Sequence, residues 1–520
     1  MLIETLFSIV VLTPDAAGVA GHLPPPERAT SAWRSLRIEA PHVAALGPPG
    51  GSGLSEELTS DGLTVDEDTS AQDSQKPPKA KKAKKKKADT VAPDEIPDPD
   101  QPTDTGSGGR HFVWKQHPSI RAGSVFRLDF QAKFQEDAHS SYSGAQGLLC
   151  ANATLPTTCA FELHRSRIGV EGYFFKRIEF EAERELREQE LTDRDLLLGY
   201  TPKSPWKDVD VNISYINNFQ VRVGRFKIPF GLDELTGDSH NDFAYRSLGA
   251  NALTPSRDIG AMAHGRFFKK RLNYWAGYFR HDGDNARSKK IVGGDDTFAG
   301  RITGRPFQNL AGLGGLEVGG AFATTEVADD TNRPNGLRGR TVLTQDTFFD
   351  AVFVKGHRRR YEGDVDWTGG PASFRAEVTW VTDQRLQQGL GSGTPPDARA
   401  RSWYLAGTWI LTGEPKTRPV KAANEFLQGG FGALEVVARA ERLWFDSPQV
   451  GSSAPSRTPR ADNILVSGNR AVTIGLNWTL NRWVKLQING IREQVEDRQR
   501  NPIANGGAFW SKVARLQFVL

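Results

Sequence analysis

The side chains best suited to chemistry in this 520-residue sequence are basic residues grouped around one long loop. Arg222, Arg225 and Lys227 lie at the end of an alternating stretch, and Arg246 and Arg257 lie within and at the end of the loop that follows. Guanidinium groups bind tetrahedral oxyanions in bidentate fashion, and lysine ammonium groups act as point charges. If the loop folds inward, these five side chains bring positive charge together, so the sequence predicts a site for small anions.

The sequence contains none of the common catalytic motifs. The sequence has no nucleophile elbow, no phosphate-binding loop ending in Gly-Lys-Ser or Gly-Lys-Thr, no His-Glu-x-x-His pair and no Cys/His metal spacing. We therefore predict that the protein is not an enzyme and uses no cofactor or metal. The net charge of +4 comes mostly from eight lysines between Lys76 and Lys87, so no nucleic-acid partner is predicted either.

The stretch that positions the basic residues reads as a strand followed by a functional loop. Apolar and polar residues alternate over residues 219–223, and the phase of this alternation changes at Gly224, which predicts a glycine bulge. Pro229 and Gly231 end the strand. About 27 residues follow before alternation resumes near Asp258, and a loop this long inside an ordered sheet is usually functional.

Composition and periodicity predict an all-β protein of the membrane-barrel type. Charged residues make up 25% of the chain and no apolar run reaches 18 residues, so a helical span is excluded and only closed strands could cross a membrane. From His111 onward the period-two pattern predicts sixteen strands. They centre on residues 125–134, 161–171, 176–186, 207–215, 219–228, 258–266, 271–280, 296–305, 316–324, 357–367, 372–383, 401–412, 433–443, 470–480, 483–494 and 510–520.

The connections between these strands alternate in length. Short ones follow the second, fourth, sixth, tenth and fourteenth strands, while mostly longer ones follow the odd strands, as expected for periplasmic turns and extracellular loops. Residues 413–432 break this rule, because a turn is expected there. Aromatic residues collect at strand ends, including Trp206, Trp444 and Trp510, as in interfacial girdles. The prediction is a transmembrane antiparallel β-barrel of about 16 strands covering residues 111–520.

The predicted register sorts the inward basic residues by their partners. Arg127 and Lys133 share the polar face of the first strand with Asp129. Pairing around a turn at residues 172–175 places Arg165 and Arg167 opposite Glu183 and Glu181, which would neutralise them.

A second pairing, around residues 216–218, places Asn212 opposite Arg222, with Asp210 on the diagonal. Arg222 and Lys227 are therefore predicted to be the better anion contacts, and a structural salt bridge is the alternative for each.

The N-terminal quarter has a different composition. Residues 1–23 resemble a degenerate signal peptide without its positive region, because Glu4 stands where Lys or Arg is usual. Residues 24–110 are rich in Pro, Gly, Ser and charge, which predicts a disordered extension. Its lysine run, Lys76–Lys87, is either a solvated linker or a segment that binds an anionic surface or polymer.

The two cysteines, Cys150 and Cys159, lie nine positions apart in a polar segment. An even pair that closes a short loop suits an oxidising compartment, so we predict a disulfide between the first two strands. Two free thiols are the alternative.

Several motifs resemble the phosphate-selective porin O/P family. Residues 224–232, Gly-Arg-Phe-Lys-Ile-Pro-Phe-Gly-Leu, resemble the family's G-Q-F-K-x-P-F-x-L; residues 245–248, Tyr-Arg-Ser-Leu, its E-R-S-L; and Pro255–Gly260 its P-x-R-x-x-G. Arg225 and Tyr245 depart from the pattern. Residues 403–414 and 471–481 resemble later strands of the same family.

The resemblance implies a trimeric channel in the bacterial outer membrane, in contact with its lipid, that prefers phosphate-like anions. Basic residues of the wall and of an inward loop would form the site. Carboxylates on the same faces, including Glu179, Glu181 and Glu183, leave a general low-selectivity porin as one alternative. A barrel that only anchors the tail or the loops for binding is another.

Overall fold

The computed structural model describes residues 110–114, 118–141, 159–187, 204–268, 271–285, 296–330, 332–503 and 506–520. The chain divides into two units, Met1–Ala88 and Asp89–Leu520, and every described residue belongs to the second. The predicted signal segment 1–23, all but the last residue of the predicted disordered extension 24–110, and Cys150 lie outside the described residues, as does the side chain of Cys159.

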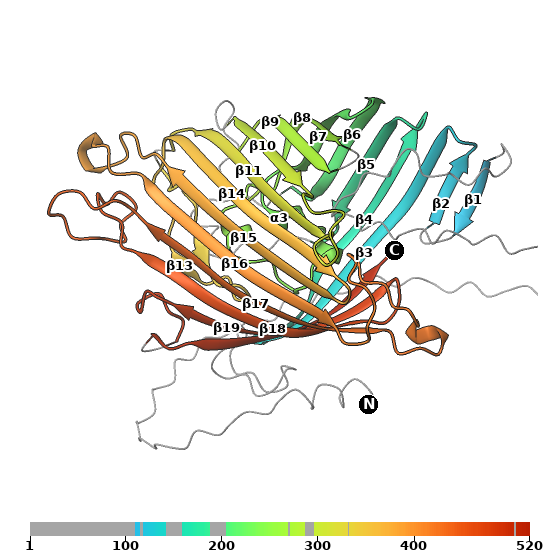
Figure 1. The fold of residues 1–520 in the computed structure, drawn as a ribbon. Coiled ribbons are helices and arrows are strands. Elements are labelled where there is room, and N and C mark those ends of the chain that lie inside the picture. The colour runs from blue at the N-terminus through green and yellow to red at the C-terminus, as the bar shows by residue number, and fades with distance from the viewer. Residues whose placement is uncertain are drawn as a thin grey trace, which may run out of the picture. The chain divides into compact units, whose positions relative to one another are not determined.

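Sixteen antiparallel strands close into a barrel, and each of the sixteen predicted strands is present (Figure 1). In chain order they are β3 (Phe126–Ser141), β4 (Cys159–Phe174), β5 (Ile178–Glu185), β6 (Trp206–Ile216), β7 (Phe219–Lys227), β8 (Arg257–Phe267), β9 (Leu272–Phe279), β10 (Thr297–Gly304), β11 (Leu316–Val327), β14 (Gly356–Gly369), β15 (Ala372–Asp383), β16 (Ala398–Ile410), β17 (Ala433–Asp446), β18 (Ser467–Thr479), β19 (Val484–Val495) and β20 (Phe509–Val519). β20 closes the barrel against β3, with Ser511 opposite Ser141 and Val519 opposite Lys133. The predicted fold class is confirmed.

Side chains along these strands alternate between the interior and the outer surface. On β17, Glu435, Arg439 and Glu441 are buried inside, whereas Val436 and Ala438 face outward. Period-two strands with an apolar outer face suit hydrocarbon outside and polar contents inside. Closure pairs the backbone groups of every barrel strand, which is the condition for residence in lipid.

Smaller elements complete the described chain. β1 (Arg110–Trp114) and β2 (Pro118–Ala122) form a hairpin, and β2 pairs with the start of β3, Ser119 opposite Asp129. β12 (Gly339–Arg340) and β13 (Thr347–Phe349) form a second small sheet. The 3-10 turns η3 (Leu390–Ser392) and η4 (Phe426–Gln428) lie in connections. None of the helices in the described ranges has the length and apolar character needed to cross a membrane.

Two local expectations from the sequence are wrong. The turn between β4 and β5 occupies residues 175–177, because Phe175 and Lys176 adopt positive φ angles of 52° and 60°. The turn therefore lies later in the chain than expected, since β4 continues to Phe174 and β5 begins only at Ile178, and Arg167 lies opposite Glu185 instead of Glu181.

The bulge expected at Gly224 is absent, since the ladders to β6 and β8 pass this residue without a register shift. Gly224 has φ 137°, and a Cβ there would lie 2.3 Å from the carbonyl oxygen of Val209, so only glycine fits. The apolar Phe226 turns to the interior instead. It is completely buried there, beside Met262 and Phe279 of the neighbouring strands.

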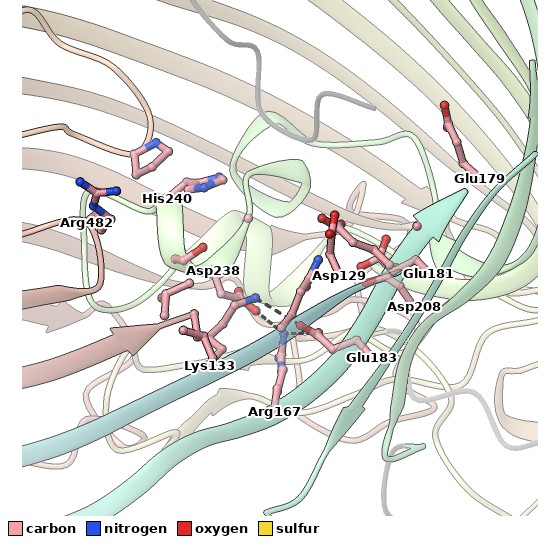
Figure 2. A pocket seen from close by; sticks show the side chains of 18 of the residues that line it. Asp129, Lys133, Arg167, Glu179, Glu181, Glu183, Asp208, Asp238, His240 and Arg482 are labelled. Carbon is pink, nitrogen blue, oxygen red and sulfur yellow. Dashed lines mark hydrogen bonds and ion pairs between the residues drawn. The ribbon is translucent and has the colours of Figure 1, made fainter. Parts of the chain in front are cut away.

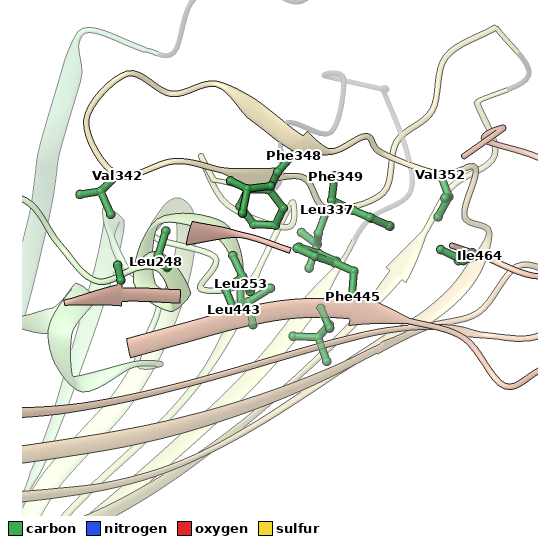
Figure 3. Packing of buried hydrophobic residues seen from close by; sticks show 14 of the residues in the cluster. Leu248, Leu253, Leu337, Val342, Phe348, Phe349, Val352, Leu443, Phe445 and Ile464 are labelled. Atoms are coloured by element: carbon green, nitrogen blue, oxygen red, sulfur yellow. The ribbon is translucent and has the colours of Figure 1, made fainter. Parts of the chain in front are cut away.

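An apolar cluster fills part of the interior near the ends of the strands that carry the longer loops (Figure 3). The connection between β11 and β14 carries β12 and β13 and contributes Phe348 and Phe349 to this cluster. Phe349 stacks on Phe445 of β17 with ring centroids 4.1 Å apart. Leu253 of the loop after β7 packs into the same cluster. The connection and the loop after β7 are thereby fixed to each other inside the barrel.

Candidate functional site

The connection between β7 and β8, residues 228–256, is here called the inward loop. Its short elements are α3 (Leu232–Leu235), η2 (Asp238–His240) and α4 (Leu248–Ala252), and the side chain of Ser247 caps α4 by accepting from Ala250 N at 3.2 Å. Ile228 and Phe230 are completely buried in the cluster around Phe226. The loop therefore begins by packing against the inner face of the wall, as the sequence predicts for a loop that folds inward.

Polar side chains of the opposite wall hold the backbone of the inward loop. Ala244 N donates to Oδ1 of Asn489 on β19 at 2.8 Å, and Leu248 N donates to Oε2 of Glu441 on β17 at 2.6 Å. Lys485 Nζ donates to the carbonyl of Asn241 at 3.0 Å. The loop thus spans the lumen from β7 and β8 to β17 and β19. Paired backbone groups inside the barrel fix its path.

Asp238 of the inward loop is neutralised by basic residues. Asp238 accepts from Arg167 of β4 at 2.7 Å and from Arg246 of the loop itself at 2.8 Å, and Arg165 lies 3.5 Å away. Burial alone would raise the pKa of Asp238, but the surrounding Arg165, Arg167, Arg246 and Lys133 hold that pKa well below its ordinary value. Asp238 is therefore a charged anchor for the wall arginines.

A cavity of about 820 Å³ lies between the inward loop and the wall formed by β3 to β7 (Figure 2). Nine carboxylate side chains and eight lysine or arginine side chains line it. The carboxylates are Asp129, Glu171, Glu179, Glu181, Glu183, Asp208, Asp210, Asp238 and Glu425, and the basic residues are Arg127, Lys133, Arg167, Arg222, Lys227, Arg257, Lys421 and Arg482. The fixed charge of the cavity is therefore nearly balanced.

Five of the seven basic residues predicted as anion contacts line this cavity, namely Arg127, Lys133, Arg222, Lys227 and Arg257. Four of them are in ion pairs: Arg127 with Asp129 at 2.5 Å, Lys133 with Glu183 at 3.3 Å, Arg222 with Asp210 at 2.6 Å and Arg257 with Asp208 at 2.7 Å. The fifth, Lys227, donates from Nζ to the carbonyls of Leu235 and Thr236 at 3.0 and 3.3 Å. The lysine therefore supports the inward loop.

Arg222 forms the structural salt bridge that was the alternative for it, and its predicted register is confirmed. Asn212 does lie opposite Arg222. The long arginine side chain reaches along the diagonal, where its Nε and Nη2 donate to the two carboxylate oxygens of Asp210 at 2.6 and 2.7 Å. Register fixes Cα positions, but a flexible side chain selects the strongest partner within reach, and a bidentate carboxylate is that partner.

The remaining two predicted residues lie elsewhere. Arg246 is buried in the inward loop, 2.8 Å from Asp238 and 3.5 Å from Glu234. Arg225 bonds Asp284 at 2.5 Å and the carbonyl of Trp206 at 2.9 Å. Neither residue is among those that line the cavity. The structure therefore brings five of the seven together.

Sequence reasoning did not identify a second segment that enters the barrel. This segment is residues 411–432, which connect β16 to β17. It is here called the turn-end segment, because it lies at the same end of the barrel as the short turn at residues 370–371. Lys416 of this segment is completely buried and bonds Asp242 of the inward loop at 2.6 Å as well as Glu435 of β17. The unusual length of this connection was the available signal.

The turn-end segment also shapes the cavity mouth. Lys421 and Glu425 line the cavity, and Glu425 pairs with Arg482 of the turn between β18 and β19 at 3.2 Å. Lys421 is exposed and makes no ion pair or hydrogen bond within the described part of the chain. The mouth therefore carries one cation without a carboxylate at contact distance.

The family described as Phosphate-selective porin O and P matches residues 135–520, which include all of this site. The chain belongs to this family. As a phosphate-selective porin O and P family member it is an outer-membrane channel, and its place is the bacterial outer membrane. No curated protein matches the chain.

Solved structures that the chain resembles include a porin, an outer-membrane channel and an outer-membrane protein. The anion-selective porin from Comamonas acidovorans is 13% identical, over 76% of this chain and 100% of that one, with a TM-score of 0.44. The outer-membrane channel DcaP of Acinetobacter baumannii is 9% identical, over 77% and 99%, with a TM-score of 0.46. OmpT of Vibrio cholerae is 8% identical, over 76% and 98%, with a TM-score of 0.44.

Proposed function

We propose that this porin passes small hydrophilic solutes by diffusion and distinguishes only weakly between anions and cations. The observation that carries the proposal is the pairing of charge in the cavity, where Arg127, Lys133, Arg222 and Arg257 each contact a carboxylate. An ion that passes such pairs meets positive and negative charges side by side, and their electric fields largely cancel. Selectivity in a water-filled pore follows the net fixed charge along the path, so balanced pairs leave little preference.

A preference for phosphate or other small anions is the second candidate. Family membership favours it, and so does the exposed Lys421 at the cavity mouth. Arg482 lines the same cavity, and its side chain is 47% exposed in spite of its ion pair with Glu425. Two accessible cations at the mouth would raise the local concentration of anions before they reach the paired charges deeper inside.

Reversal potentials in a potassium chloride gradient across a planar bilayer test these candidates. We expect a chloride to potassium permeability ratio within about threefold of one, and little block of the current by added phosphate. An anion preference of tenfold or more together with phosphate block would favour the second candidate. A barrel that inserts but carries no current would instead support the anchor function.

The assembly and the N-terminal region belong to the same proposal. Family membership supports a homotrimer embedded in outer-membrane lipid. The composition of residues 24–110 supports a disordered extension whose lysine run, Lys76–Lys87, would remain available to an anionic surface or polymer.

A further inference from the structure

Six basic side chains face away from the lumen on five neighbouring strands, β16 to β20. They are Arg399, Arg401, Arg442, Arg470, Arg492 and Lys512, here called the outer basic band. Five of them lie between two buried neighbours, as Arg492 does between Ile491 and Glu493, and Arg399 lies next to the buried Ala400. The strand alternation therefore turns all six to the outer surface. The band contributes nothing to the lumen and needs another explanation.

The band is continuous across the sheet and lies near one rim of the barrel. Arg442 of β17 is directly opposite Arg470 of β18, and Arg492 of β19 is opposite Trp510 of β20. All six residues lie in the strand halves that lead to the longer connections. Longer loops of outer-membrane barrels are extracellular, so this rim faces the outer leaflet.

Nearby carboxylates neutralise only part of this charge. Arg401 pairs with Asp446 at 3.0 Å, and Glu496 is shared between Arg442 at 2.8 Å and Arg470 at 3.0 Å. The remaining carboxylate close to the band, Asp397, interacts with Arg399 without an ion-pair contact.

Two band residues, Arg492 and Lys512, make no ion pair or hydrogen bond with any described residue. Arg442 and Arg470 lie directly opposite each other and share the single carboxylate of Glu496, which leaves a net positive charge on this rim.

The surrounding side chains place the band at the level of lipid head groups. Trp444 and Trp510 lie among the basic residues, and the guanidinium of Arg442 lies over the Trp444 ring at 4.7 Å. Further along the same strands the outward residues are apolar and exposed, including Leu405 and Ile474. Tryptophan marks the interface in membrane proteins, and arginine on the hydrocarbon face is costly. The band therefore meets head groups and not acyl chains.

We propose that the outer basic band binds the phosphate groups of outer-leaflet lipid head groups. Guanidinium forks suit phosphate bidentately, and basic residues near a membrane surface attract anionic lipid at that depth. Arg470 has the most accessible of the ion-paired side chains of the band, with 63% of its surface exposed. The site would hold a row of phosphorylated lipids against strands β16 to β20, independently of what passes through the lumen.

Native mass spectrometry of the detergent-extracted full chain tests this proposal. The probes are lipid A with both phosphates, the same lipid after enzymatic dephosphorylation, and inorganic phosphate alone. We expect the wild type to retain the phosphorylated lipid and not the dephosphorylated form. The triple variant Arg470→Gln, Arg492→Gln, Lys512→Gln should retain about a hundredfold less, since each of the three surface cations contributes about fivefold to anionic lipid binding.

The matched control is the variant Lys176→Gln, Arg177→Gln, Arg271→Gln, which removes three cations at the opposite rim. It should retain lipid as the wild type does, whereas the variant Arg470→Lys, Arg492→Lys should retain most of it. Heat-modifiable migration confirms that each barrel is folded. Equal retention by the wild type and the Gln variant, retention of dephosphorylated lipid, binding of inorganic phosphate alone, or loss of assembly in the Gln variant would each overturn the proposal.

Discussion

The guanidinium of Arg222 is held by Asp210 through two hydrogen bonds, so an ion in the cavity meets an ion pair at this point. The pair also lies beside Glu181, whose carboxylate is 3.5 Å from Arg222. The positive charge of Arg222 is thus distributed over two carboxylates on neighbouring strands. Counting basic residues on the wall therefore overstates the positive field in the lumen.

We predict that removing one member of this pair changes selectivity and that removing both restores it. Arg222→Gln leaves Asp210 negative in the passage, so permeability should shift toward cations by roughly twofold, the effect of one unit charge at about 8 Å in water. Adding Asp210→Asn removes the excess charge and should return the permeability ratio to the wild-type value. Reversal potentials of the two single variants and the double variant measure this cycle.

Lys421→Gln is the control for an unpaired cation. It should shift permeability toward cations by a similar amount, because it also removes one positive charge from the path. A loss of anion permeation in Arg222→Gln that persists in the double variant would instead make Arg222 a direct anion contact.

For single residues, the sequence predicts where each residue lies on its strand but not which side chain it bonds. The register placed Asn212 opposite Arg222 correctly, although Ile216 pairs with Phe219 at the turn and a register shift between Ile213 and Ile216 is needed to reach that pairing. The choice of Asp210 depends on the rotamer of a long side chain and on what else lies in the cavity, which no pattern encodes. Arg167 shows the same limit, since it contacts Asp238, 71 positions away.

At the scale of elements, the inward loop and the turn-end segment are joined by a buried ion pair. Lys416 lies between Asp242 of the loop and Glu435 of β17. Arg418 of the same segment lies 3.1 Å from Asp366 of β14 and 3.7 Å from Asp242. Each element therefore limits the movement of the other, and both line the route to the cavity mouth.

We predict that Lys416→Met releases the turn-end segment. The substitution leaves Asp242 and Glu435 buried without their shared cation, which costs about 3 to 5 kcal/mol in buried ion pairs. The segment should then leave the lumen part of the time, and single-channel conductance should rise and become noisier. Protease cleavage within residues 411–432 should become faster.

Lys421→Met provides the matched comparison, because it removes an exposed lysine of the same segment that pairs with nothing described. It should leave conductance noise and cleavage unchanged. Wild-type behaviour of Lys416→Met in both measurements would show that the ion pair does not hold the segment.

A second buried network fixes the connection after β9. Asp282 accepts from Arg358 at 2.5 Å, from Arg360 and from Thr325 at 2.7 Å, and Arg360 also donates to the carbonyl of Leu253 at 2.8 Å. Burial alone would raise the pKa of Asp282, but Arg360 and Arg358 lower it from 3.8 to about 2. A depressed carboxyl pKa stabilises the fold above the ordinary pKa, and this stability is lost as pH falls through about 2.

We therefore predict that Asp282→Asn lowers the thermal stability of the barrel at pH 6 and that the deficit shrinks progressively as the pH falls from about 4 to about 2. A shift of this size corresponds to about 2 kcal/mol. Heat-modifiable migration of the wild type and the variant, measured from pH 6 to pH 2, tests the sign and the window. Asp284→Asn, which removes the partly exposed partner of Arg225, should cause a smaller deficit. A deficit that disappears already at pH 4 would contradict the assignment.

The elements themselves were predictable to different degrees. All sixteen barrel strands follow from alternation, because one face meets hydrocarbon and the other meets polar contents. The β1–β2 hairpin was missed, since residues 110–122 show no such alternation. The inward path of residues 411–432 was also missed, because it depends on contacts such as Lys416 with Asp242 that only the closed barrel creates.

At the scale of the whole molecule, the barrel is closed by pairing near its two ends, 378 residues apart. Arg515 of β20 donates to Asp137 of β3 from Nε and Nη2 at 2.6 and 2.7 Å, and it also bonds the carbonyl of Ala244 in the inward loop. Gln135 and Gln517 pair across the same seam at 2.7 Å. Arg515 therefore both closes the barrel wall and holds the inward loop in place, so a change at this residue affects the wall and the lumen together.

The last prediction concerns the chain that precedes the barrel. Residues 24–110 contain too little apolar surface to offset the entropy of ordering, whereas the barrel from β3 onward has its backbone groups paired between strands. Trypsin should therefore cleave the detergent-solubilised protein first within Lys76–Lys87 and leave a resistant core that begins near residue 110. The trimmed core should conduct like the full chain, because the described residues that line the cavity begin at Arg127. N-terminal sequencing of the core and bilayer recordings before and after digestion provide the measurement.

Early cleavage between residues 206 and 279, where strands β6 to β9 lie, would contradict the barrel boundary. A change in conductance on trimming would show that the extension reaches the pore.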